Sequence, residues 1–163
     1  MILKLVNVDD NMARSVVCAS PLKNGAFAQV KGLANEAKAG VALNGEAFEV
    51  EALTDDAAKM FVIIAPDVPA ANRYKDEYRY NMADYDDVEA HEMTRAYILH
   101  RGDRVQVEKE LVEGSPAAGA KLAVKAGGYT LAKAAGTEKA VVAMVLKKGI
   151  KINGKDMVQI MFL

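Results

Sequence analysis

The sequence predicts a mainly β protein, with small barrel-like or sandwich-like units joined by a polar connector and little helix. Two observations favour this fold class. Dipeptides that accept the positive φ angles of tight turns recur along the chain, namely Asn24-Gly25, Asn44-Gly45, Gly102-Asp103, Gly127-Gly128 and Asn153-Gly154. The segments between them are short and rich in β-branched and other apolar residues, as strands are.

Each expected strand has its own pattern. Residues 26–33 and 47–53 have the length and composition of strands, and the continuously apolar run 60–65 predicts a strand buried on both faces. Residues 104–108 alternate polar and apolar, which is typical of a half-exposed strand. Helix signals are weak: residues 86–99 could form a short helix, whereas Gly127 and Gly128 argue against a long helix in the alanine-rich stretch 119–135.

The C-terminal part predicts β structure that folds back on itself. Apolar segments at 141–146, 150–152 and 157–163 flank the Asn153-Gly154 turn, and a three-stranded meander is one arrangement they allow. Because the chain ends within an apolar segment, we expect its C-terminus to be paired and covered.

The main internal boundary is expected at Pro66 and Pro69, because proline blocks the continuation of both helices and central strands. The predicted organisation is an N-terminal β unit of residues 1–65, a polar connector of residues 66–95 and a C-terminal barrel-like β unit of residues 96–163.

Composition narrows the class of protein. The chain has 163 residues, 52% of them hydrophobic, and a net charge of −1, so a core is expected and neither nucleic acid nor a membrane surface is an expected partner. It contains no apolar run of ~20 residues and does not begin like a signal peptide, which predicts synthesis in a reducing cytoplasm. Cys18 is the only cysteine, so neither an intrachain disulfide nor a thiolate metal cluster is expected, and Cys18 itself is expected to be buried.

No residue pattern predicts a catalytic, cofactor-binding or metal-binding site. His91-Glu92 lacks the second histidine of a zinc-protease helix, and the acidic segment 84–92 does not match a calcium loop, so we interpret it as a solvated surface. Arg101-Gly102-Asp103 precedes an alternating strand and is interpreted as a turn.

Charge is distributed unevenly along the chain. Residues 45–92 contain thirteen acidic and four basic residues, and residues 121–155 contain eight lysines and one acidic residue. Two opposed patches of this kind suit association with further copies of the chain or docking on a partner. Six residues within or beside them are candidate interface residues: Tyr74, Tyr78, Tyr80, Tyr85, Lys147 and Lys148.

Several segments, taken in order, resemble the small head decoration proteins, or capsid auxiliary proteins, of tailed bacteriophages. They are PLKNGAFAQV (21–30), MFVIIAP (60–66), TRAYILHRGDRVQV (94–107), AAGAKL (117–122), GGYTL (127–131) and the closing apolar strands. The resemblance implies a non-enzymatic virion protein that binds the outer surface of the capsid and stabilises it, without a cofactor. It also implies the major capsid protein as partner and a homo-oligomer, with a trimer favoured. The acidic segment 84–92 departs from the family pattern.

The sequence also allows two other functions. One is a small β-barrel binding module for carbohydrate or single-stranded nucleic acid, which needs aromatic side chains gathered on one barrel face. The absence of tryptophan counts against it. The other is a small hydrolase that uses a divalent ion on the carboxylates of residues 84–92.

Overall fold

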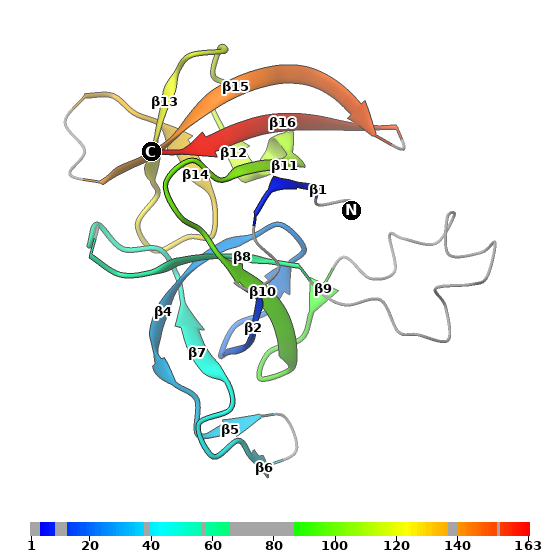
Figure 1. Ribbon diagram of the computed structural model, residues 1–163, viewed down its shortest axis with the longest axis vertical. Coiled ribbons are helices and arrows are strands. Elements are labelled where there is room, and N and C mark those ends of the chain that lie inside the picture. The colour runs from blue at the N-terminus through cyan, green and yellow to red at the C-terminus, as the bar shows by residue number, and fades with distance from the viewer. Residues whose placement is uncertain are drawn as a thin grey trace.

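The computed structural model confirms a mainly β fold, in which a closed five-stranded barrel lies against a larger sheet (Figure 1). The structure describes residues 4–8, 13–37, 40–56, 58–65, 87–136, 140–152 and 154–163. None of the described residues forms a helix long and apolar enough to cross a membrane.

The barrel consists of five short strands in the order β10-β2-β7-β4-β8. Their bounds are β2 (Ala13–Cys18), β4 (Phe27–Leu33), β7 (Phe48–Glu51), β8 (Phe61–Ile64) and β10 (Met93–Ile98). All neighbours pair antiparallel except β2 and β7, which run parallel. A barrel of so few strands has room only for compact side chains, and its buried cluster is accordingly rich in alanine and valine, with Ala28, Val50, Val62 and Ala96 among its members.

The larger sheet has seven strands in the order β1-β11-β16-β15-β13-β14-β12. Their bounds are β1 (Lys4–Asn7), β11 (Arg104–Glu108), β12 (Val112–Glu113), β13 (Lys121–Val124), β14 (Leu131–Lys133), β15 (Val141–Ile152) and β16 (Lys155–Phe162). The 3-10 turn η6 (Lys109–Leu111) joins β11 to β12. Two small ladders complete the fold: β3 (Leu22–Lys23) with β9 (Asp87–Val88), and β5 (Glu36–Ala37) with β6 (Val41–Ala42).

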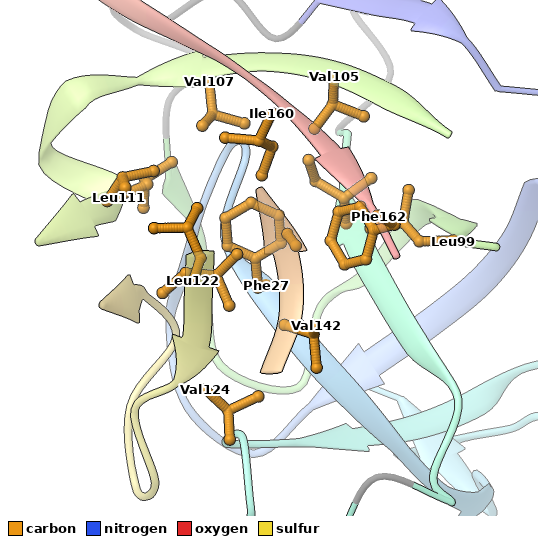
Figure 2. Packing of buried hydrophobic residues seen from close by; sticks show 14 of the residues in the cluster. Phe27, Leu99, Val105, Val107, Leu111, Leu122, Val124, Val142, Ile160 and Phe162 are labelled. Atoms are coloured by element: carbon orange, nitrogen blue, oxygen red, sulfur yellow. The ribbon is translucent and has the colours of Figure 1, made fainter. Parts of the chain in front are cut away.

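One hydrophobic core joins the barrel to the seven-stranded sheet. Phe27 and Ile63 of the barrel belong to the same buried cluster as Ile160 and Phe162 of β16 (Figure 2). The rings of Phe27 and Phe162 lie 6.1 Å apart between centroids, at an interplanar angle of 49°. Within the run 60–65 the strand β8 has buried side chains on both faces as predicted, because Ile63 belongs to this shared core while Val62 and Ile64 belong to the cluster inside the barrel. Met60 at the start of the run is exposed.

Backbone hydrogen bonds join the two parts at the turn between β13 and β14. The Phe27 N–H donates to the Tyr129 carbonyl at 3.0 Å, and the Leu53 N–H donates to the Gly128 carbonyl at 2.9 Å. The Gly127 N–H returns a bond to the Leu53 carbonyl at 2.8 Å. Gly127 has a φ of 79°, which explains why glycine suits this turn.

The short helix that the sequence allows at residues 86–99 is not formed by the described residues 87–99. This stretch contains β9 and β10, separated by a turn in which His91 has a φ of 61°. In β10 the exposed Met93 and Arg95 alternate with Ala96 and Ile98, which are buried in the barrel. A period of two over this stretch outweighs its weak helix propensity.

The predicted segment boundaries differ from the observed sheets at two places. Residues 93–98, assigned to the end of the connector and the start of the C-terminal unit, pair with β2 and β8 and close the N-terminal barrel. At the other end of the chain, β1 pairs with β11 in the seven-stranded sheet. Each sheet therefore includes one strand contributed from the opposite half of the sequence.

The C-terminal segments form two long strands and no three-stranded meander, because β15 runs without a turn from Val141 to Ile152. The C-terminus is paired as predicted, since β16 lies between β11 and β15 and the Leu163 N–H donates to the Val142 carbonyl at 3.0 Å. The alternating strand at 104–108 is confirmed as β11, with Val105 and Val107 buried.

The tripeptide Arg101-Gly102-Asp103 forms a turn, as predicted. The Asp103 carboxylate accepts a hydrogen bond from the His100 N–H at 2.7 Å, and the Gly102 N–H donates to the Phe162 carbonyl at 2.9 Å. The tripeptide thus forms the turn that leads from the barrel strand β10 into β11 of the larger sheet.

Candidate interaction surfaces

The predicted interface residues separate into two groups. Tyr74, Tyr78, Tyr80 and Tyr85 lie outside the described residues. Lys147 and Lys148 are exposed on β15, in the long hairpin that this strand forms with β16 (Figure 1).

The hairpin is irregular where it carries these lysines. The register of β15 against β16 shifts between Val145 and Lys147 and again between Lys147 and Ile150. Gly149, with a φ of 72°, supplies the left-handed residue in this irregular stretch. In a regular strand consecutive side chains point to opposite faces, but here the neighbours Lys147 and Lys148 are both exposed.

One side of this part of β15 is unpaired within the described chain. β13 pairs with β15 only over Val141–Met144, and the last bonds across this edge join Val145 to Gly119 and Ala120. From residue 146 to residue 152 the structure describes a neighbour, β16, on one side only. The unpaired side is called the β15 edge below.

Lysines of the hairpin differ in their ion pairs. Lys155 lies 2.7 Å from Glu108, whose hydrogen bond is the main reason that the pKa of Lys155 is raised. Lys151 lies 4.0 Å from Asp156. Lys147 and Lys148 have no ion pair within the part of the chain that the structure describes, so their charges are available to a partner.

A polar groove of about 980 Å³ lies beside the same hairpin. It is lined by Lys23, Asn24, Glu108, Lys109, Glu110, Leu111, Val112, Glu113, Gly114, Ser115, Thr130, Lys155 and Asp156. Small-molecule sites are usually lined mainly by apolar and aromatic side chains. This lining contains no aromatic residue, and its two large apolar residues, Leu111 and Val112, are buried in the core.

Glu113 in this groove has two hydrogen-bond donors. Lys125 contacts both carboxylate oxygens at 2.8 Å, and the Thr130 hydroxyl donates to Oε1 at 2.9 Å. These bonds, that of Lys125 first, lower the pKa of Glu113. A carboxyl group held ionised in this way is poorly suited to act as a general acid.

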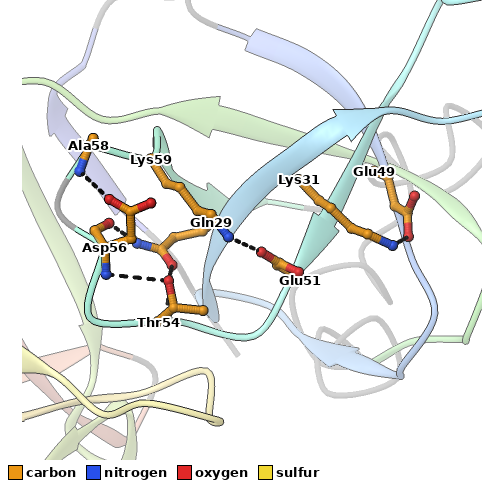
Figure 3. Close-up of polar contacts among 8 residues, drawn as sticks. All are labelled: Gln29, Lys31, Glu49, Glu51, Thr54, Asp56, Ala58 and Lys59. Carbon is orange, nitrogen blue, oxygen red and sulfur yellow. Dashed lines mark hydrogen bonds and ion pairs between the residues drawn. The ribbon is translucent and has the colours of Figure 1, made fainter.

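On the barrel, several acidic side chains already have cationic partners. Lys31 pairs with Glu49 at 2.6 Å, which raises the pKa of Lys31, and Lys59 pairs with Glu51 (Figure 3). Among the described acidic residues of segment 45–92, only Glu49 and Glu51 lie in barrel strands, whereas most described lysines of segment 121–155 lie in strands of the larger sheet. Part of the acidic charge is neutralised locally.

A part-buried polar contact links the barrel to the turn between β13 and β14 of the larger sheet. Cys18 is buried as predicted, and its sulfur lies 3.4 Å from the Tyr129 hydroxyl. Burial is the main cause that raises the pKa of Tyr129. Among the described residues no three histidine, cysteine or acidic side chains come together as a possible metal site.

Exposed aromatic platforms are absent from the described part of the chain. Phe27, Tyr97 and Phe162 are buried, while Phe48, Phe61 and Tyr129 are half-buried. The stacking surface that a carbohydrate or single-strand binding module needs is therefore not built by the described residues.

Sequence reasoning missed the groove and the unpaired state of the β15 edge. The groove gathers residues from four separate stretches of the chain, and no local pattern marks such a combination. For the edge, the signal was present in part, because lysines are common on exposed edge strands.

Comparison with known proteins found no matching family model and no matching curated protein. The resemblance to phage decoration proteins therefore rests on the sequence segments quoted above.

Proposed function

We propose that this protein is a non-enzymatic component of a bacteriophage virion, which binds the outer surface of the capsid through the major capsid protein and stabilises the shell. The observation that carries the proposal is the β15–β16 hairpin, with its β15 edge and the exposed side chains of Lys147 and Lys148. An added strand can form main-chain hydrogen bonds with such an edge, and the two positive charges favour a partner that carries negative charge. The ordered resemblance to decoration proteins supplies the identity of the partner.

Weak contacts suffice for this function because a shell repeats them. Each copy gains avidity when it is held by more than one contact at once, so no single strong site is required. We propose that the protein acts as a homo-oligomer, with a trimer favoured, in which the opposite net charges of segments 45–92 and 121–155 attract neighbouring copies to one another.

The direct experiment is cosedimentation of the purified protein with capsid shells that lack it. We expect saturable binding that weakens as salt screens the lysines, and shells that disrupt at a higher temperature when coated. Absence of binding at every salt concentration would contradict the proposal.

The solution mass of the free protein tests the oligomer separately. Light scattering at low salt and at about 0.5 M salt, where surface charge pairing is largely screened, is expected to show a closed oligomer that loosens with salt. A monomer under both conditions would contradict the charge-paired oligomer while leaving capsid binding open.

A further inference from the structure

We infer that the β15 edge, residues 146–152, binds an extended acidic segment of the partner protein as an added antiparallel or parallel strand. The inference rests on the proposed function only for the source of that segment, the capsid protein. Its physical basis is the edge itself.

The backbone is the first part of the argument. β15 is the longest strand of the structure, at 12 residues, and β13 covers only its first part. Within the described chain the remaining residues present main-chain donors and acceptors on one side. An incoming strand can satisfy these groups by continuing the sheet.

Charge is the second part, and it decides which strand fits. Lys147, Lys148 and Lys151 lie within this short stretch and all are exposed. A second copy that paired through the same edge would bring these lysines together, and directly opposed like charges destabilise a strand pair. An acidic strand would instead place carboxylates opposite ammonium groups.

Apolar side chains between the lysines define the rest of the partner. Leu146, Ile150 and Ile152 are half-buried, so part of each remains accessible beside the edge. A segment in which glutamate or aspartate alternates with β-branched residues matches both properties. Duplex DNA or an anionic membrane would bind the lysines but would not pair with the free backbone groups as an added strand does.

Two synthetic peptides provide the test without a capsid. One has eight residues in which valine alternates with glutamate, and the other replaces glutamate by lysine. Each is added at millimolar concentration to the isotopically labelled full chain, and NMR follows the amide shifts and hydrogen exchange. We expect the glutamate peptide to bind about tenfold more tightly, from two cross-strand charge pairs of ordinary strength, and to slow exchange within residues 146–152.

A charge-reversed variant tests whether the lysines of the β15 edge cause the preference for the glutamate peptide. The double substitution Lys147→Glu and Lys148→Glu is expected to reverse the preference between the two peptides. Lys109→Glu with Lys133→Glu makes the same change in net charge away from the edge, at exposed residues, and is expected to leave the preference unchanged. Unaltered preference in the first variant would overturn the inference.

Several other outcomes would also overturn it. These are equal binding of both peptides, protection at another strand, and shifts of the lysines without slowed amide exchange. Binding of duplex DNA or anionic vesicles that the glutamate peptide does not displace would count equally against it.

Failure of the edge is distinguishable from failure of the proposed function. If the charge-reversed variant still binds capsid shells as tightly as the unaltered protein, the edge is not the capsid contact although the function holds. If the glutamate peptide binds at the edge and capsid shells do not bind, the edge inference holds and the capsid is not the partner.

Discussion

A substitution of Gln29 tests how much the hydrogen bonds of one buried amide contribute to the stability of this fold. It lies in β4, is fully buried, and is the only buried polar side chain among the described residues. Its Oε1 accepts hydrogen bonds from the Thr54 N–H at 2.7 Å and the Thr54 hydroxyl at 2.8 Å, and its Nε2 donates to the Asp56 carbonyl at 3.0 Å (Figure 3). The amide thereby holds the loop that begins at Leu53, which is bonded to the Gly127-Gly128 turn of the larger sheet.

Replacing Gln29 by leucine keeps the approximate volume and removes all three bonds. Each is worth about 1 kcal/mol of net stability, which sets an upper range near ~3 kcal/mol. Thr54 is half-buried and Asp56 is exposed, so water can replace some of the hydrogen bonds that these two residues lose. We therefore expect Gln29→Leu to lower the free energy of unfolding by about 2 kcal/mol, and the melting temperature by roughly 4–8 °C for a chain of this size.

Urea unfolding and a double-mutant cycle with Thr54→Val provide the assay. Thr54→Val removes the long bond that the hydroxyl accepts from the Asp56 N–H at 3.4 Å and the bond that it donates to Gln29, and should cost about 1 kcal/mol. Because the two residues share that bond, the two effects should not add when the substitutions are combined. Hydrogen exchange at the Leu53 amide should also become faster in Gln29→Leu. A loss of stability below ~0.5 kcal/mol, or full additivity in the cycle, would refute the assigned role of the amide.

Three further predictions concern single sites. Gly149→Ala should lower the free energy of unfolding by about 1 kcal/mol in thermal unfolding, because the added Cβ has open space but the φ of 72° is strained for alanine. Gly32→Ala is the matched control, since Gly32 has equally open space and no positive φ. An equal loss of stability in both variants would contradict this explanation. The lowered pKa of Glu113 means that its contribution is present above the unfolded carboxyl pKa of about 4.3 and is lost as pH falls through the lower folded value. Stability curves of Glu113→Gln should therefore be flatter in this acidic range, and an unchanged slope would show that another group is responsible. The buried Cys18 thiol should react with a thiol reagent only on unfolding, so rapid labelling of the native protein would contradict its placement.

Strands with a clear local pattern were predictable from the sequence. The continuous apolar run around Ile63 required two buried faces, and the structure places it between two cores. The alternation at Val105 and Val107 required one buried face, which is what β11 has. In both cases side-chain burial follows directly from the period of the strand.

Long-range pairings were not predictable in the same way. Nothing in residues 93–98 marks them as the strand that closes the barrel, because their partners β2 and β8 lie far away along the chain. The parallel pairing of β2 with β7 likewise leaves no local signature. The sequence divides β15 into apolar segments 141–146 and 150–152, which allowed a three-stranded meander, yet pairing with β16 makes the polar residues between them an irregular part of one strand.

The distribution of strand edges explains why the lysines lie where they do. In the closed barrel each of the five strands has a neighbour on both sides, so none of them is an edge strand. In the described part of the larger sheet, the terminal strands β1 and β12 are short, at 4 and 2 residues, whereas the uncovered part of β15 extends from residue 146 to residue 152. A long edge without charge would pair with its own copies. Lysines at this edge prevent that pairing, and the same repulsion leaves an acidic strand as the complementary partner.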